Sequence, residues 1–189
     1  MSELLYPISA APVLRGGKCK RGDEMLPIVS ESGVVIAQAS RRFVHAGKKP
    51  LHPVVHLHII DRYGRIFLQK RSLSRQLYPG RWDTAVGGHV GYGETILEAL
   101  YRETREELGL LEFNPTEIDT YVYESDTERE LVHVFAIVGN FELDPHNTEV
   151  EEGRYWTEGE IMRAASGKLL TPNFLSEYTR LGNTLRALL

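Results

Sequence analysis

Three glutamates near the middle of the chain, Glu103, Glu106 and Glu107, have a spacing that suits metal chemistry. Residues three and four positions apart lie on one face of an α-helix, so these carboxylates are expected side by side. Like charges at this spacing repel by about 0.2–0.5 kcal/mol per pair. They also fall in the last turns of the predicted helix, where the helix dipole disfavours negative charge. A hard divalent cation would relieve this repulsion, because carboxylate oxygens are its natural ligands.

The residues before these glutamates favour a ligand site. Gly87 and Gly88, together with two more glycines before position 94, predict a loop whose backbone can approach a ligand closely. Glu94 stands at the start of the predicted helix, where its charge suits the helix dipole and where it could orient Arg102. The alternative interpretation is a solvated acidic helix face, in which Arg102 relieves the repulsion by pairing with Glu106 four residues away.

The segment from Gly88 to Leu110 resembles the Nudix box, Gly-x5-Glu-x7-Arg-Glu-U-x-Glu-Glu-x-Gly-U, in which U is a bulky aliphatic residue. Every charged position and every glycine of this pattern is present. The one departure is Thr104 at the first U position, where a β-branched side chain of similar size adds a hydroxyl group. The resemblance extends over about residues 52–160, and the run Trp82–His89 is similar to the branch of the family that contains isopentenyl-diphosphate isomerase.

This resemblance implies an α/β fold, the Nudix-type α/β/α sandwich with a mixed β-sheet, in which the box forms a loop, a helix and a loop. It also implies dependence on Mg²⁺ or Mn²⁺ and hydrolysis of a diphosphate bond in a nucleoside diphosphate derivative or a related small organic diphosphate. The metal ligands and the other catalytic residues would be Glu103, Glu106 and Glu107, with Arg102 and Glu94. The residues expected to meet the substrate are Gly87, Gly88, Lys70 and Arg71, with Arg75 and Arg81 as further basic candidates. Taken singly, each of these basic side chains has the alternative interpretation of an ordinary surface charge.

The sequence leaves open which residue takes a proton from the attacking water. It could be one of the box glutamates, or one of Glu149, Glu151 and Glu152, which precede Trp156 in a predicted loop where many Nudix enzymes bring in a further carboxylate. The alternative for these three residues is a solvated acidic turn. The substrate is also left open, because in this fold it is set by loops outside the box.

Two other functions are weighed against hydrolysis. An isomerase of the similar branch needs a cysteine two residues before His89, but Gly87 stands there and Cys19 lies far upstream. His89 matches a metal-binding histidine of the isomerase and His56 lies in a similar strand, although both have the simpler interpretation of polar strand or loop residues. A non-catalytic nucleotide-binding Nudix module would usually lose box carboxylates, and this chain keeps all of them.

The elements that must position these residues follow from hydrophobic periodicity and from turn signals. A hairpin is expected over 25–38 with Gly33 in its turn, and residues 41–53 are expected to form a connection. The box helix is expected over 95–108, ended by Gly109. The other expected elements are strands at 54–60, 65–69, 82–86, 118–123, 131–138 and 154–157, a polar loop at 69–79, a helix through 161–165 capped by Thr157, and a C-terminal helix at 174–188.

Length and composition bound the remaining possibilities. The 189 residues carry a net charge of −4 and fit an N-terminal arm at 1–23 followed by a single Nudix domain at 24–189. The mild acidity argues against a generally basic nucleic-acid binder, and no apolar run is long enough to span a membrane. With one cysteine and no signal-peptide pattern, a cytoplasmic enzyme is expected. The apolar hairpin is expected to pack on its own domain or to form a homodimer, because a lone two-stranded hairpin is marginal in water.

Overall fold

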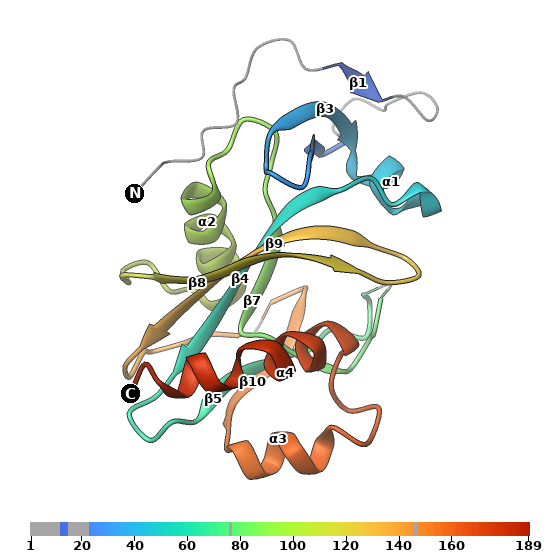
Figure 1. Cartoon of the computed structure of the whole chain (residues 1–189). Coiled ribbons are helices and arrows are strands. Elements are labelled where there is room, and N and C mark those ends of the chain that lie inside the picture. Colours follow the sequence, from blue (N-terminus) through green and yellow to red (C-terminus); the bar gives the residue numbers. More distant parts are fainter. Residues whose placement is uncertain (1–11, 15–22, 76, 146) are drawn as a thin grey trace. The chain divides into compact units, whose positions relative to one another are not determined.

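The computed structural model of the protein describes residues 12–14, 23–75, 77–145 and 147–189 (Figure 1). The chain divides into two compact units. The first comprises Met1–Val55, Gly88–Tyr101 and Asp119–His133, and the second comprises His56–Gly87, Arg102–Ile118 and Val134–Leu189. The elements that run from one unit into the other are β4 (His52–Ile60), β7 (Val86–His89), β8 (Thr116–Glu124), β9 (Arg129–Val138) and α2 (Ile96–Leu108).

The strands of the described residues form two sheets. In the smaller sheet, β1 (Val13–Leu14) lies parallel and β2 (Met25–Val29) antiparallel to the central strand β3 (Val35–Ser40). The larger sheet has seven strands in the order β10-β5-β4-β9-β8, with β6 paired to β5 and β7 paired to β4. Its remaining strands are β5 (Ile66–Arg71), β6 (Trp82–Asp83) and β10 (Val150–Trp156). The strand predicted at 82–86 is therefore two short strands, β6 and β7, in the structure.

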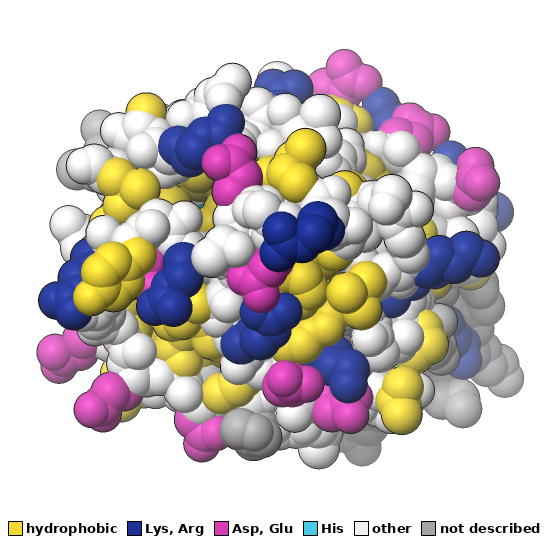
Figure 2. All heavy atoms as spheres, turned by 90° about the horizontal axis from the view of Figure 1, so that it is seen from below, with side chains coloured by type: hydrophobic (Ala, Val, Ile, Leu, Met, Phe, Trp, Pro, Cys, Tyr) yellow, Lys and Arg dark blue, Asp and Glu magenta, His cyan; other side chains and the backbone are white. Residues whose placement is uncertain are grey.

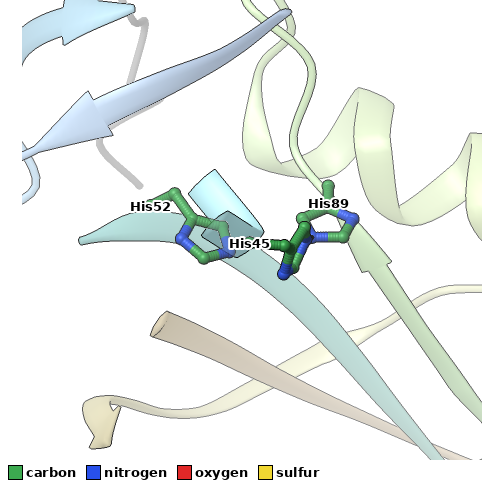
Figure 3. A group of neighbouring side chains, drawn as sticks. All are labelled: His45, His52 and His89. Atoms are coloured by element: carbon green, nitrogen blue, oxygen red, sulfur yellow. The ribbon is translucent and has the colours of Figure 1, made fainter. Parts of the chain in front are cut away.

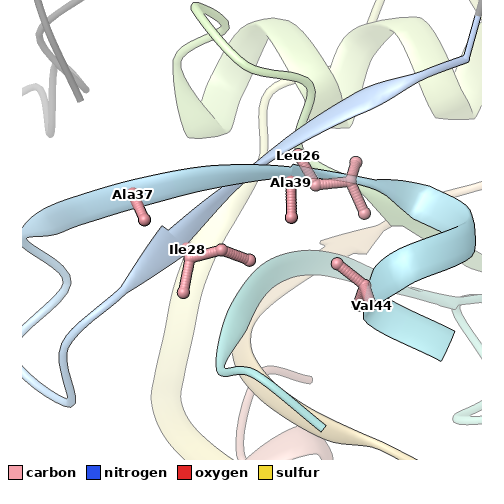
Figure 4. Close-up of a cluster of buried hydrophobic side chains, with 5 residues drawn as sticks. All are labelled: Leu26, Ile28, Ala37, Ala39 and Val44. Atoms are coloured by element: carbon pink, nitrogen blue, oxygen red, sulfur yellow. The ribbon is translucent and has the colours of Figure 1, made fainter. Parts of the chain in front are cut away.

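The predicted N-terminal hairpin is formed by β2 and β3 in the first unit. Gly33 has a φ of 79° in its turn, a backbone conformation that glycine adopts without strain. The amide of Val29 donates a hydrogen bond to the carbonyl of Leu51 (2.9 Å). The buried cluster of this region consists of Leu26, Ile28, Ala37, Ala39 and Val44 (Figure 4). The hairpin thus packs on its own chain, which is one of the two arrangements expected, and the homodimer stays a prediction.

Strand β10 pairs antiparallel with β5 in the second unit, and both strands are longer than predicted. Lys70 stands opposite Glu152, and the register shifts between Val150 and Glu152. The expectation that Glu151 and Glu152 lie in a loop is therefore wrong. The polar loop predicted at 69–79 begins only after position 71, because the pairing with β10 extends β5.

Helix α2 carries the helical part of the Nudix box; it ends at Leu108 as predicted and begins at Ile96, one residue later than predicted. Its buried residues include the predicted stripe of Ile96, Leu100, Thr104 and Leu108, together with Ala99 and Glu107. Gly109 follows the last turn with a φ of 67°, as expected for the residue that ends a helix. Thr104, the departure from the box pattern, is fully buried, so its volume fits the place of an aliphatic residue.

Two more helices follow β10 in the second unit. α3 (Glu158–Ala164) begins with the predicted capping box, in which the Thr157 hydroxyl accepts from the amide of Glu160 and the Glu160 carboxylate bonds back. α4 (Pro172–Arg186) begins at Pro172 rather than at position 174, because the hydroxyl of Thr171 caps it by accepting from the amide of Phe174. It also ends earlier than the predicted limit at 188.

The segment between β3 and β4 is more structured than the predicted connection at 41–53. It contains α1 (Arg41–Phe43) and the π-helical turn η1 (Val44–Lys48), and β4 already begins at His52. Lys49 has a φ of 44°, a left-handed conformation that the composition of the segment does not signal. Of the arm predicted at 1–23, residues 1–11 and 15–22 lie outside the described residues, and Val13–Leu14 forms β1.

The surface has charges of both signs. On the face shown in Figure 2, side chains of Lys and Arg alternate with those of Asp and Glu and with hydrophobic groups, so this face carries no broad region of one sign. Within the part of the chain that the structure describes, no helix is long and apolar enough to cross a membrane. The predicted limits of the arm and of the single domain stay predictions.

Candidate active site

The three box glutamates lie on α2 in the second unit, and they differ in exposure. The Glu106 side chain is 54% exposed and that of Glu103 is 12% exposed, whereas Glu107 is buried. The exposure of the three carboxylates therefore decreases from Glu106, which lies in water, through Glu103 to Glu107, which is enclosed by protein. A cation held between such groups would be reached from solvent on one side and sheltered on the other.

Glu107 is the enclosed carboxylate. Its Oε2 atom accepts hydrogen bonds from the side-chain amide of Gln69 (3.0 Å) and from the backbone amide of Gly87 (3.3 Å). Burial raises the pKa of Glu107 to about 8, and the negative charge of Glu103 adds to this rise. Two neutral donors thus compensate the charge of this carboxylate only in part. A bound cation would balance the negative charge that remains.

Arg102 provides the positive charge on the same helix. Its Nη1 atom donates to Glu103 Oε1 (2.7 Å) and lies 3.4 Å from Glu106 Oε2. Burial raises the pKa of Glu103, and the hydrogen bond and charge of Arg102 oppose this rise. Arg102 therefore fixes the orientation of two box carboxylates. The pairing with Glu106 foreseen in the alternative interpretation is present. Arg102 bonds to Glu103 and Glu106, whereas the donors to Glu107 are the neutral amides of Gln69 and Gly87.

Glu94 has a separate place in the first unit. Its carboxylate accepts a hydrogen bond from the backbone amide of Gly91 (2.8 Å). A Cβ atom on Gly91 would stand 2.9 Å from that carboxylate, so a larger residue there would make the Glu94 side chain shift. Glu94 therefore anchors the glycine loop ahead of α2, and the predicted orientation of Arg102 by Glu94 stays a prediction.

The oxygen atoms around Glu107 suit a hard divalent cation. Gln69 is buried, and while its amide nitrogen donates to Glu107, its Oε1 atom has no hydrogen-bond partner among the described residues. A buried amide oxygen without a donor is costly, and cation ligation or an ordered water would satisfy it. Carboxylate and amide oxygens are the ligands that Mg²⁺ and Mn²⁺ prefer. The residues present therefore fit the metal that the family resemblance implies.

Asn147 connects the end of α2 to the start of β10. Its Nδ2 atom donates to the carbonyl of Glu107 (2.8 Å), and its Oδ1 atom accepts from the amides of Glu149 (2.8 Å) and Val150 (2.9 Å). The charge of Glu149 raises the pKa values of Glu103 and Glu107, so this carboxylate acts on the box electrostatically. Asn147, three residues before β10, was not predicted, although an Asn that bonds the backbone two residues on is an Asx-turn signal.

The basic candidates differ in how they are held. Arg75 pairs with Glu149 (2.8 Å), and Lys70 pairs with Glu151 (3.5 Å). Arg71 donates to the carbonyl of Leu77 (3.1 Å) and to Asp83 (3.1 Å), so it supports the loop after β5. Of these two predicted substrate contacts, Lys70 has the weaker contact, since its partner is an exposed carboxylate at 3.5 Å whereas Arg71 makes two hydrogen bonds.

A second cluster of possible metal ligands lies in the first unit. His45 comes from η1, His52 from β4 and His89 from β7, and their side chains converge (Figure 3). One ligand atom from each lies within 4.8 Å of the others, and the Nε2 atoms of His45 and His89 are 3.1 Å apart. Neighbouring nitrogen ligands in a tetrahedral zinc site are about 3.3 Å apart, as bond lengths near 2.0–2.1 Å require.

The surroundings of these imidazoles also suit a cation. The Nδ1 atom of His52 donates to the carbonyl of Pro50 (3.0 Å), which leaves the lone pair on Nε2, and Nε2 makes no hydrogen bond to any described residue. Burial lowers the pKa of His52 to about 4, so the ring is neutral and able to bind metal. Glu128 lies 3.7 Å from His45 Nδ1, and Glu130 lies 4.0 Å from His52 Nε2.

This histidine cluster was not predicted. His89 had been singled out, but His45 and His52 lay in the expected connection, where they read as parts of a basic linker. The signal available in the sequence was two histidines seven residues apart, upstream of His89. That spacing alone does not distinguish ligands from surface side chains.

Comparison with known proteins identifies the family. Residues 50–175 match the NUDIX domain. An uncharacterised Nudix hydrolase of Yersinia pestis is 34% identical over 140 residues, which cover 73% of this chain and 75% of that protein. The chain therefore belongs to the Nudix family.

Two further comparisons bear on the branch and on the fold. An isopentenyl-diphosphate Delta-isomerase of Brevibacterium linens is 28% identical over 166 residues, which cover 84% of this chain and 91% of that enzyme. The crystal structure of a Deinococcus radiodurans protein matches with a TM-score of 0.73 and 24% identity, covering 83% of this chain and 98% of that one. The predicted Nudix-type α/β/α fold with a mixed β-sheet is thereby confirmed.

Proposed function

We propose that this protein is a metal-dependent hydrolase that cleaves the diphosphate bond of a nucleoside diphosphate derivative or of a related small organic diphosphate. The observation that carries the proposal is the arrangement around Glu107, a buried carboxylate next to Glu103 whose donors are two neutral amides. A purely structural helix has no use for such a group. The Nudix box, which keeps every charged position and every glycine, supports the same conclusion.

Glu103, Glu106 and Glu107 would hold the cation, with the amide oxygen of Gln69 beside them. When bound, Mg²⁺ or Mn²⁺ neutralises phosphate charge and makes a bound water more acidic. Arg102 keeps Glu103 and Glu106 oriented through its two contacts.

The remaining residues handle the substrate and the proton. In hydrolysis, a water oxygen bonds to phosphorus while the bridging P–O bond breaks and the bridging oxygen keeps the electron pair. Glu149 is our candidate for the base that takes the water proton, because its charge acts on Glu103 and Glu107. Lys70 and the backbone at Gly87 and Gly88 would meet the phosphate oxygens, whereas Arg71 would shape the loop that follows β5.

The test is a substrate panel. The purified protein is incubated with nucleoside diphosphate sugars, dinucleoside polyphosphates, nucleoside triphosphates and small organic diphosphates, with Mg²⁺ or Mn²⁺, and released phosphate or pyrophosphate is measured with coupling enzymes. Turnover of at least one class that vanishes in Glu106→Gln supports hydrolysis. Absence of turnover across the panel with either metal would refute the proposal.

A second candidate function is an isomerase-like activity on an isopentenyl-type diphosphate. The observation that favours it is the cluster of His45, His52 and His89. The observation against it is Gly87, which stands where the resemblance calls for a cysteine. Incubation with isopentenyl diphosphate and Mg²⁺, Mn²⁺ or Zn²⁺, followed by chromatography, separates the two: we expect no allylic isomer. A non-catalytic nucleotide-binding module would bind nucleotides and turn over nothing.

A further inference from the structure

A buried carboxylate of the second unit lies between two histidines. Glu177 of α4 is fully buried, and its Oε2 atom lies 2.8 Å from Nδ1 of His56 while its Oε1 atom lies 2.7 Å from Nε2 of His58. Both histidines come from β4. A carboxylate so placed is found where an imidazole must be held in one tautomer and one orientation.

The charge balance of this group favours an ionised Glu177. Burial alone would raise its pKa, but the charge and hydrogen bonds of His56, together with those of His58, hold this pKa well below its usual range. An ionised carboxylate at this position stabilises the protonated imidazole beside it, because the two opposite charges share a site from which water is excluded. The cluster can therefore keep one imidazole in its acidic form.

The two histidines differ in access. The His58 side chain is fully buried, whereas that of His56 is 12% exposed. A Cβ atom on Gly87 would stand 3.7 Å from His56 Nε2, so this nitrogen faces the glycine. The amide of the same glycine donates to Glu107. Gly87 is thus a neighbour of both His56 and a box carboxylate.

We propose that His56 is a catalytic residue of the diphosphate hydrolysis, with Glu177 as the residue that positions it. The inference rests on the proposed function. The water oxygen bonds to phosphorus, the bridging P–O bond breaks, and the bridging oxygen takes the electron pair and the proton from His56 Nε2. The proton lost by the water goes to a carboxylate of the site, and His56 takes a proton from solvent after the products leave.

The alternative is a structural role in which the three side chains only fasten α4 to β4. The chain offers matched variants that separate the two. Asn places an amide N–H near the Nδ1 position, so His56→Asn keeps the donor to Glu177 but removes Nε2. Gln places an amide near the Nε2 position, so His58→Gln keeps the other donor to Glu177 and removes an imidazole that is fully buried.

The experiment measures kcat and KM against pH for the wild type and these variants on the best substrate of the panel, with melting curves as a check of folding. General acid catalysis contributes about 10²–10⁴-fold, so His56→Asn should lower kcat by that factor with little change in KM. The decrease of kcat at high pH, which we call the alkaline limb, should also be absent from His56→Asn and present in His58→Gln. A p-nitrophenyl nucleotide ester, whose leaving group needs no proton, should be cleaved by His56→Asn with a much smaller defect.

Glu177→Gln provides a second route if His56→Asn does not fold. Removing the carboxylate charge lowers the pKa of His56, so the alkaline limb should move to lower pH. The titratable groups that face His56 in the second unit include Glu177 of α4, His58 of β4 and, beyond Gly87, Glu107 of α2.

The outcomes are distinguishable. A wild-type protein that is inactive on the whole panel overturns the proposed function, and the role of His56 with it. An active wild type with an equally active His56→Asn, or with an unmoved limb in Glu177→Gln, overturns the role of His56 alone. A loss of kcat confined to His56→Asn, with His58→Gln near wild type, supports it.

Discussion

The buried carboxylate of Glu107 should make the metal-free protein less stable as pH rises, and Glu107→Gln should remove this effect. Glutamine has nearly the same shape, and its amide oxygen can accept the hydrogen bonds from Gln69 and Gly87. The substitution therefore removes a charge with little change in packing. In the folded protein, burial raises the pKa of this group from 4.5 to about 8.

The sign and size follow from linkage. Below the pKa of the unfolded state, the Glu107 carboxyl is protonated in both the folded and the unfolded protein, so it does not lower the free energy of unfolding. Between the two pKa values the unfolded chain releases the proton and the folded chain keeps it, so the free energy of unfolding falls by about 1.4 kcal/mol per pH unit. The loss is about 1 kcal/mol at pH 5 and about 3 kcal/mol at pH 7, and it levels off above the folded pKa.

The assay is urea unfolding followed by circular dichroism from pH 5 to pH 8, with a chelator and again with saturating Mg²⁺. With chelator, the free energy of unfolding of Glu107→Gln relative to that of the wild type should rise by about 2 kcal/mol between pH 5 and pH 7. A ligand at 100 times its Kd stabilises the folded state by about 2.7 kcal/mol, so Mg²⁺ should cancel most of this advantage by stabilising the wild type.

Glu106→Gln is the matched control. It removes a charge from the same helix, but the Glu106 side chain is 54% exposed, so it tests the loss of a negative charge without the burial. Curves for Glu107→Gln and wild type that stay parallel from pH 5 to pH 8 with chelator would refute the reasoning. They would mean that Glu107 ionises in the folded protein as it does in water.

The remaining predictions concern activity and assembly. Chelation should abolish hydrolysis and added Mg²⁺ or Mn²⁺ should restore it, as measured by phosphate release; activity that survives exhaustive chelation would exclude the proposed mechanism. Glu106→Gln should lower turnover by on the order of 10²-fold or more with an unchanged melting temperature, because an exposed side chain contributes little to packing. If a homodimer forms through the hairpin, replacing the exposed Val34 and Ile36 by Ser should shift sedimentation toward the monomer; a monomeric wild type at micromolar concentration would remove that hypothesis.

The box helix could be predicted because its information is local. Helical periodicity defines the buried stripe, Gly109 ends the helix, and the spacing of the glutamates lies within two turns. The burial of Glu107 could not be predicted in this way. It depends on Gln69 and Gly87, which come from strands that pairing, not spacing, brings to the helix.

The histidine cluster illustrates a different limit. His45 lies in a π-helical turn that ends in a left-handed residue, Lys49, and neither feature has a strong signal in composition. His52 opens β4, although the two prolines beside it favour a connection up to position 53. Ligands carried by three such elements converge only in the folded chain, so a search by spacing misses them.

Glu177 is a residue whose burial could have been predicted from the sequence, if the polar residues within apolar stripes had been considered as well as the periodicity. Helical spacing puts it on the same face of α4 as Phe174, Tyr178 and Leu181, which are buried. A glutamate in an apolar stripe is a local conflict, and natural sequences keep such conflicts mainly where a function requires them. His56 and the fully buried His58 stand two residues apart on one face of a strand that is otherwise apolar from Val54 to Ile60, which is a conflict of the same kind. Glu177 in α4 needs partners for its carboxylate, and His56 and His58 in β4 need a partner for their imidazoles. Both needs are met at once when α4 packs on β4.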